Sequence, residues 1–178
     1  MGIVSTAIIF FFAGFDTTAT TLSLVVYALM NYPDTQEKLR QEIEDVIGAD
    51  EKITADHLKE LKYMENVLNE AMRYYFTFGK IYIYSLKVFH IETAGLQRTC
   101  TKDYKVPGMD FTIEKGLIVN VLPPGAECFS NPDTFDPDNF DPDNNPNKFG
   151  FTGFGQGPRA CIGKEDGKCC CVNADCAL

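Results

Sequence analysis

The chain has 178 residues, of which 45% are hydrophobic, and its formal net charge is −9. This length and apolar content predict one folded domain with a sizeable core and exclude a disordered chain. The negative charge argues against nucleic acid or an anionic membrane as the main electrostatic partner. Four of the seven cysteines lie in the last ten residues and no signal-peptide pattern precedes them. We therefore expect a reducing compartment and no disulfide framework.

The first thirty residues contain one charged side chain, that of Asp16, among apolar residues on every side. This pattern predicts a long buried helix over residues 3–31, which ends before Pro33. A membrane anchor is the alternative. It is disfavoured because an aspartate at the centre of a spanning helix costs roughly 2.5–3.5 kcal/mol, and because no basic flank precedes the apolar run.

Two further helices follow in the sequence. Residues 34–48 mix charged and apolar residues at helical spacing and end in a glycine, which is typical of an amphipathic surface helix. Residues 54–74 carry an apolar stripe and predict a third helix.

The pattern changes to short strands over residues 97–100, 104–106 and 117–121, which are separated by Pro-Gly and Lys-Gly turn signals. Residues 123–147 are rich in Pro, Asp and Asn and predict an irregular loop. The expected fold class is therefore mainly α with a small β region.

The segment from Phe154 to Gly163 places one cysteine in a stretch too rich in Gly and Pro to form a regular helix or strand. Gly157 and Gly163 lack the Cβ that would keep the backbone away from a large flat group. Arg159 suits a carboxylate, and Cys161 offers a thiolate, which is one of the axial ligands that haem iron accepts. An inert surface turn is one alternative. A zinc site is another, disfavoured because the nearby cysteines form no C-x-x-C pair and no histidine lies close to them.

This segment resembles the cysteine loop of the cytochrome P450 family, F-x-x-G-x-R-x-C-x-G, whose fixed positions are met by Phe154, Gly157, Arg159, Cys161 and Gly163. The resemblance implies the C-terminal portion of the cytochrome P450 fold and a haem cofactor (heme, iron protoporphyrin IX). It also implies that Cys161 is the metal ligand, that Phe154 shields its sulfur and that Arg159 reaches a haem propionate.

A second motif, Ala13-Gly14-Phe15-Asp16-Thr17-Thr18, lies inside the first predicted helix. Thr17 can bond back to the carbonyl four residues earlier, which would loosen the helix and leave a gap. The stretch is similar to the oxygen-binding groove of the same family, A/G-G-x-D/E-T-T. This resemblance implies that Ala13 and Gly14 lie against the cofactor and that Asp16 and Thr17 act in oxygen activation. The alternative is a helix with two incidental polar residues.

Glu70 and Arg73 form the E-x-x-R motif expected of the family, in which the pair is buried and supports the cysteine loop. Buried charges need partners, and the family usually supplies a third one, an arginine in a P-E-R-F-like segment. The matching stretch here is Pro137-Asp138-Asn139-Phe140, so Asn139 stands where arginine is most typical. The resemblance implies a structural role for these three residues.

Two segments depart from the family. Residues 76–90 have no family counterpart and are interpreted as an insertion. Residues 165–178 are polar and cysteine-rich, where the family continues into an apolar helix, and are interpreted as an aberrant C-terminus. We therefore interpret residues 1–178 as a partial domain, from the oxygen-groove helix to the cysteine loop, without the family's membrane anchor.

The chain looks especially like insect microsomal members that metabolise xenobiotics. The resemblance implies a monooxygenase that inserts one oxygen atom from O2 into a lipophilic small molecule, at the cytosolic face of the endoplasmic reticulum. NADPH-cytochrome P450 reductase is the implied electron donor, with cytochrome b5 as a further candidate partner. Two hypotheses remain beside it: a truncated, inactive fragment with weak or no haem binding, and a membrane-anchored, cysteine-rich metal binder.

Overall fold

The computed structural model describes residues 2–48, 52–76, 96–121, 129, 132–144, 153–155 and 157–175. Helices dominate it, and the strands are few and short, which confirms the predicted mainly α fold class. The helical elements are α1 (Ile3–Asn31), α2 (Pro33–Ile47), α3 (Ala55–Glu60), α4 (Lys62–Ala71), the π-helical turn η1 (Met72–Phe76), the 3₁₀ turns η4 (Pro137–Phe140) and η5 (Gly157–Arg159), and α5 (Lys164–Asp175). The strands are β1 (Leu96–Thr99), β2 (Tyr104–Lys105), β3 (Thr112–Ile113) and β4 (Ile118–Val121).

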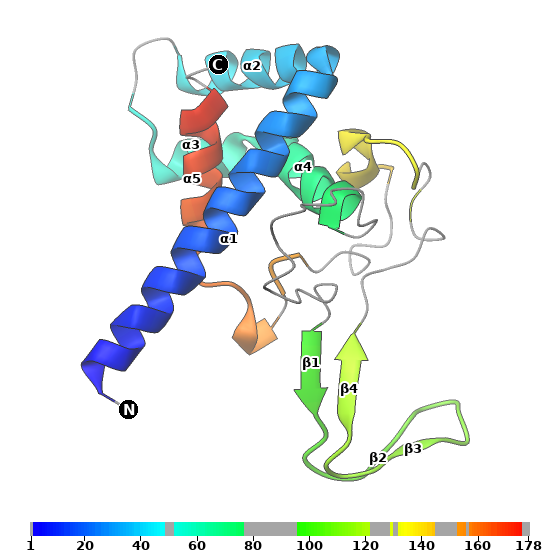
Figure 1. Cartoon of the computed structure of the whole chain (residues 1–178). Helices are drawn as coiled ribbons and strands as arrows, with labels where there is room; N and C mark the ends of the chain where they lie inside the picture. Colours follow the sequence, from blue (N-terminus) through cyan, green and yellow to red (C-terminus); the bar gives the residue numbers. More distant parts are fainter. Residues whose placement is uncertain are drawn as a thin grey trace.

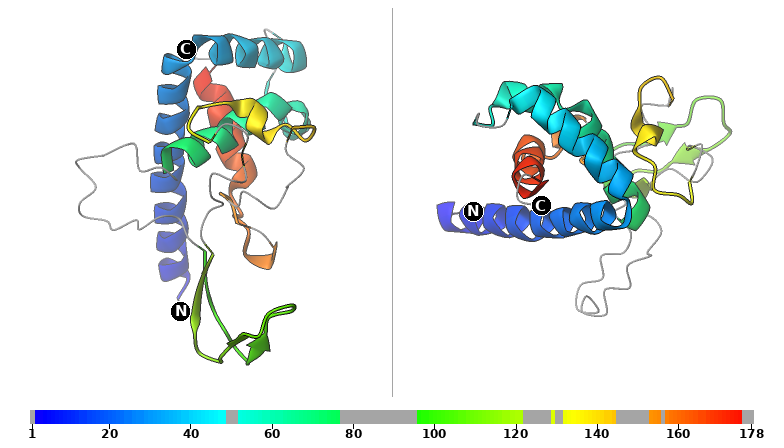
Figure 2. Two further views of the ribbon diagram at one scale, coloured as in Figure 1. Left: turned by 90° about the vertical axis from the view of Figure 1, so that its right-hand side faces the viewer. Right: turned by 90° about the horizontal axis from the view of Figure 1, so that it is seen from above.

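The helices pack around the second half of α1. Helix α2 lies across the end of α1, while α4 and α5 lie against its side (Figures 1 and 2). The core between them consists of aliphatic side chains from α1, α2 and α4, closed on one side by α5. Its most buried members include Ala28, Leu29, Leu39, Met64, Val67, Leu68 and Val172.

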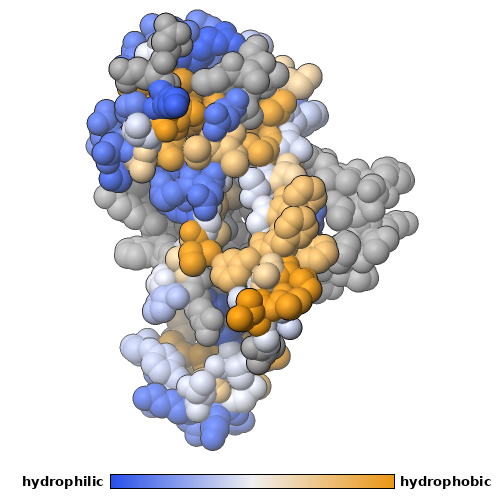
Figure 3. All heavy atoms as spheres, turned by 90° about the vertical axis from the view of Figure 1, so that its left-hand side faces the viewer, coloured by the Kyte–Doolittle hydropathy of each residue, from blue (hydrophilic) through white to orange (hydrophobic). Residues whose placement is uncertain are grey.

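The first half of α1 is exposed, contrary to the prediction of a helix buried along its length. Its buried residues are Leu24, Val25, Ala28 and Leu29, whereas aromatic side chains nearer the N-terminus, such as Phe11 at 66% exposure, face outward. An all-round apolar pattern needs neighbours on every side, and the helices that contact α1 gather at its other end. Figure 3 shows hydrophobic side chains gathered on this surface. By length and composition α1 could also cross a membrane, a test that core helices of soluble proteins pass as well.

The predicted third helix, residues 54–74, is present but divided at Leu61 into α3 and α4. Thr54 caps α3, because its hydroxyl accepts a hydrogen bond from the His57 amide. The cap of α4 comes from another helix: the Glu42 carboxylate of α2 accepts hydrogen bonds from the amides of Tyr63 and Met64 at 2.7 and 2.8 Å. These bonds satisfy amides that a helix start leaves without an internal partner.

The strands form two antiparallel pairs, β1 with β4 and β2 with β3. Strand β3 is absent from the prediction, while the other three lie within the predicted ranges or one residue from them. Gly108 and Gly116 adopt positive φ angles of 77° and 94° at the predicted turns. Glycine tolerates this region because it has no Cβ.

The predicted irregular loop, residues 123–147, contains one regular turn, η4, within its described part at 132–144. Of the predicted insertion at residues 76–90, only the backbone of Phe76 belongs to the described part of the chain, and the remaining residues lie outside it.

Candidate functional site

The cysteine loop is a closed turn that leads into α5. The amide of Cys161 donates a hydrogen bond to the carbonyl oxygen of Phe154 at 2.7 Å, and the amide of Ala160 donates to that of Gly157 at 3.0 Å. Gly155 and Gly157 have φ angles of 69° and 71°, which residues with a Cβ rarely adopt. The glycines therefore allow the chain to turn back on itself within this short segment.

The side chain of Cys161 is exposed on this loop, three residues before α5 begins. A Cβ added at Gly157 or Gly163 would meet nothing within 4 Å, so the backbone here is open to a large neighbour. Phe154 is partly buried against the hydrophobic core. The backbone of Arg159 lies in η5, and its side chain is outside the described part of the structure.

The Ala13–Thr18 segment lies in the exposed half of α1. The Thr17 hydroxyl donates to the carbonyl oxygen of Ala13 at 2.5 Å, as its position in a helix allows. This bond does not interrupt α1, which runs continuously from Ile3 to Asn31, so the expected gap is not formed. Asp16 is exposed, and a Cβ at Gly14 would meet nothing within 4 Å. Within the described residues, no hydrogen bond or ion pair joins this segment to Cys161.

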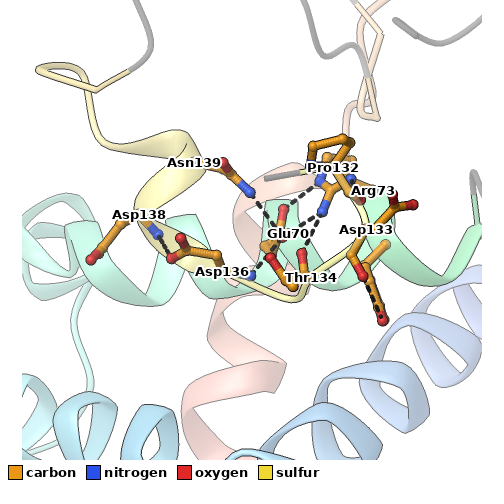
Figure 4. A network of polar contacts seen from close by, with 9 residues as sticks. Glu70, Arg73, Pro132, Asp133, Thr134, Asp136, Asp138 and Asn139 are labelled. Atoms are coloured by element: carbon orange, nitrogen blue, oxygen red, sulfur yellow. Dashed lines mark hydrogen bonds and ion pairs between the residues drawn. The ribbon is translucent and has the colours of Figure 1, made fainter. Parts of the chain in front are cut away.

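Glu70 of α4 and Arg73 of η1 form a buried ion pair. The Arg73 Nε and Nη2 atoms each donate to one Glu70 carboxylate oxygen at 2.6 Å, a two-pronged geometry (Figure 4). The two side chains are only 0% and 2% exposed. Arg73 also donates to the carbonyl oxygens of Pro132 and Thr134 at 2.9 and 3.0 Å. The guanidinium therefore ties α4 to the segment that follows residue 132.

The Glu70 carboxylate also binds the segment that follows residue 132. Its Oε1 atom accepts hydrogen bonds from the Asp136 amide at 2.8 Å and from Asn139 Nδ2 at 3.3 Å. The contact expected between Asn139 and Glu70 is thus present, and it carries no charge. Burial raises the pKa of the Glu70 carboxyl above its ordinary value, although the hydrogen bonds from Arg73, Asp136 and Asn139 act in the opposite direction.

A second charged network joins α4 to α5 and is not predicted by the sequence analysis. Glu65 on α4 pairs with Lys164 at 2.8 Å and with Lys168 at 3.0 Å, both on α5. The spacing of four residues between the two lysines places them on one helix face, which is the only signal in the sequence that could have suggested a shared partner.

The described residues bring together no group of three or more His, Cys, Asp or Glu side chains that could hold a metal ion. The cysteine loop instead offers one exposed thiol beside glycines with open space above them. A single thiolate in such a surrounding fits a haem, because haem iron takes one axial thiolate from the protein. The residues present therefore fit this cofactor on the thiolate side.

Comparisons with known proteins show the family of the chain. The family model for cytochrome P450 matches residues 1–167. The chain is 37% identical to cytochrome P450 6B6 of Helicoverpa armigera, 35% to cytochrome P450 6a9 of Drosophila melanogaster and 33% to cytochrome P450 3A14 of Cavia porcellus. These alignments cover 90–91% of this chain and 30–31% of each relative. The chain thus spans about a third of the length of the curated relatives it matches.

Proposed function

Because this chain belongs to the cytochrome P450 family, we propose that its cysteine loop supplies the thiolate ligand of a haem monooxygenase. The observation that carries the proposal is the exposed Cys161 thiol. It lies on a turn that is closed by the hydrogen bond from the Cys161 amide, and the neighbouring glycines have open space around them. A bound haem supplies the oxidation chemistry, in which one oxygen atom of O2 enters a lipophilic small molecule.

The residues of the loop hold the cofactor. Cys161 would supply the thiolate that ligates the haem iron, Phe154 would shield its sulfur from water, and Arg159 would pair with a haem propionate. Gly157 and Gly163 admit the flat macrocycle because they carry no side chain.

The Ala13–Thr17 segment would contribute to oxygen activation beside the bound haem. Ala13 and Gly14 leave room beside α1, since a Cβ at Gly14 meets no neighbour. The Thr17 hydroxyl donates its proton to the Ala13 carbonyl oxygen, and the Asp16 side chain is exposed to water. Together they can hold and deliver the protons that oxygen activation requires.

Glu70, Arg73 and Asn139 act as scaffold. They hold the 132–140 segment on α4 and take no part in the chemistry. The partners that the family membership supports are O2, NADPH-cytochrome P450 reductase and cytochrome b5, at the cytosolic face of the endoplasmic reticulum membrane.

The exposed first half of α1 favours a second candidate, in which the isolated 178 residues bind haem weakly or not at all and have no catalytic activity. A helix face that carries this many exposed aromatic side chains needs a covering partner.

One spectrum separates the two candidates. The purified chain is mixed with haem, reduced and exposed to carbon monoxide. We expect the strongly red-shifted absorption band of a thiolate–haem complex, its loss in Cys161→Ser, and its retention in Cys100→Ser as the matched control. A chain without the band supports the inactive fragment, and a band that survives Cys161→Ser overturns the assignment of the ligand.

A further inference from the structure

Helix α5 is fixed to α4 by one carboxylate that serves two lysines. The carboxylate of Glu65, on α4, forms ion pairs with Lys164 Nζ at 2.8 Å and with Lys168 Nζ at 3.0 Å. Lys168 is only 5% exposed, which is unusual for a lysine. Its ammonium therefore needs this partner, because a buried charge without one is strongly destabilising.

The same face of α5 carries the residues that enter the core. Cys171 and Val172 follow Lys168 at three and four residues, and both are buried among side chains of α1 and α4. The ion pairs and the apolar contacts thus act on one face, and they fix both the position and the rotation of α5 on the other helices.

Lys164 connects this attachment to the cysteine loop. It is the first residue of α5, and its ammonium lies 5.8 Å from the centre of the Phe154 ring, at the distance of a cation–π contact. The carbonyl oxygen of Phe154 accepts the amide hydrogen bond of Cys161 at 2.7 Å. A continuous series of contacts therefore runs from Glu65 through Lys164 and Phe154 to Cys161.

The charge state of Glu65 supports the series. Burial alone would raise the pKa of its carboxyl, but hydrogen bonds from Lys164 and Lys168 lower it below the ordinary value. The carboxylate is thus ionised, and able to hold both lysines, at neutral pH.

We propose that Glu65 and Lys164 are positioning residues for the Cys161 loop, which they hold at a fixed place relative to α4 through Phe154. The position of the loop relative to α4 does not depend on haem. That this position serves a metal ligand rests on the proposed function. Nothing in the family motifs quoted above assigns a role to either residue.

Hydrogen–deuterium exchange of the full chain, without haem, tests the proposal. Lys164→Met removes the cation but keeps most of the side-chain volume, whereas Lys164→Arg keeps the cation. We expect Lys164→Met and Glu65→Gln to speed exchange in peptides over residues 157–164 by about two- to fivefold, the factor set by a partly exposed ion pair. Lys164→Arg restores protection. Glu165→Gln is the matched control, because Glu165 also pairs with Lys168, at 3.5 Å, but is exposed, and this pair lies within α5.

Three outcomes overturn the proposal: unchanged exchange over residues 157–164, acceleration confined to residues 165–175, or equal acceleration throughout α2 and α4. The second would show that the lysines hold α5 alone, and the third that they support the fold in general. The experiment also separates the two claims, because exchange does not depend on haem. A chain that shows the expected exchange but no thiolate–haem band keeps the positioning role and loses the proposed function.

Discussion

The Glu70 carboxylate shows how far one side chain can organise a buried site. It accepts two hydrogen bonds from Arg73, one from a backbone amide and one from Asn139. Where the family pattern most often has a third charged group, this chain uses a neutral amide. The charge of the pair is therefore balanced between Glu70 of α4 and Arg73 of the adjoining η1, and Asn139 adds only a hydrogen bond from η4.

The different contributions of these residues can be measured by urea unfolding. Asn139→Ala is expected to lower the free energy of unfolding by about 1 kcal/mol, the usual value of one hydrogen bond. Arg73→Met is expected to lower it by about 3–5 kcal/mol, because it leaves a buried carboxylate without its cation. Asn144→Ala, on the exposed side of the same segment, is the control and should change little. Equal losses in Asn139→Ala and Arg73→Met would contradict this division.

At the scale of elements, the predicted boundaries succeed where local signals decide them. Helices α1 and α2 begin and end within one residue of the prediction, because Pro33 and Gly48 mark their ends. The break at Leu61 was not predictable in this way, since the carboxylate that caps α4 belongs to Glu42, about twenty residues earlier on another helix. Helix α5 has a polar and cysteine-rich sequence, and Glu65, the partner of its buried Lys168, is also remote in the chain.

The same distinction holds for the candidate site. The E-x-x-R spacing predicted the buried pair of Glu70 and Arg73, which the structure shows, whereas the ligand role of Cys161 stays a prediction from the spacing of the cysteine loop. The partners of Lys164 and Lys168 depend on how α5 is placed against α4, which no local pattern records. Glu65, Lys164 and Lys168 were missed for this reason.

Gly14 provides a prediction for α1 as an element. Gly14→Ala is expected to stabilise the helix by up to about 1 kcal/mol, because alanine is the better helix former and its Cβ meets no neighbour. Ala13→Gly at the adjacent exposed position is the matched control and should change stability in the opposite direction. Thermal unfolding followed by circular dichroism measures both variants. A destabilised Gly14→Ala would show that another group packs against Gly14 in the folded chain.

At the scale of the whole molecule, α1 has two halves with different environments. Its second half is part of the core, whereas its first half presents aromatic side chains to the solvent (Figure 3). Continuous exposed apolar surface of this kind is associated with contact to another surface or with aggregation.

A pair of matched variants tests this division. Phe11→Ala is expected to change the free energy of unfolding by less than about 0.5 kcal/mol, since its side chain is exposed. Leu29→Ala, at 1% exposure in the same helix, is expected to lower it by about 2–5 kcal/mol. Phe11→Ala should also reduce the binding of a hydrophobic dye and the tendency to aggregate. A large loss of stability in Phe11→Ala would mean that the first half of α1 is covered in solution.

The two strand pairs form an arm beside the helices, and the two ends of this arm meet. Leu96 and Val121 are direct partners in the β1–β4 register, so the two ends of the arm lie side by side (Figure 1). A unit whose ends already meet can be shortened, lengthened or exchanged without moving the rest of a protein. Grafting this arm between relatives is therefore a change that leaves the helical body intact, and evolution has the same freedom.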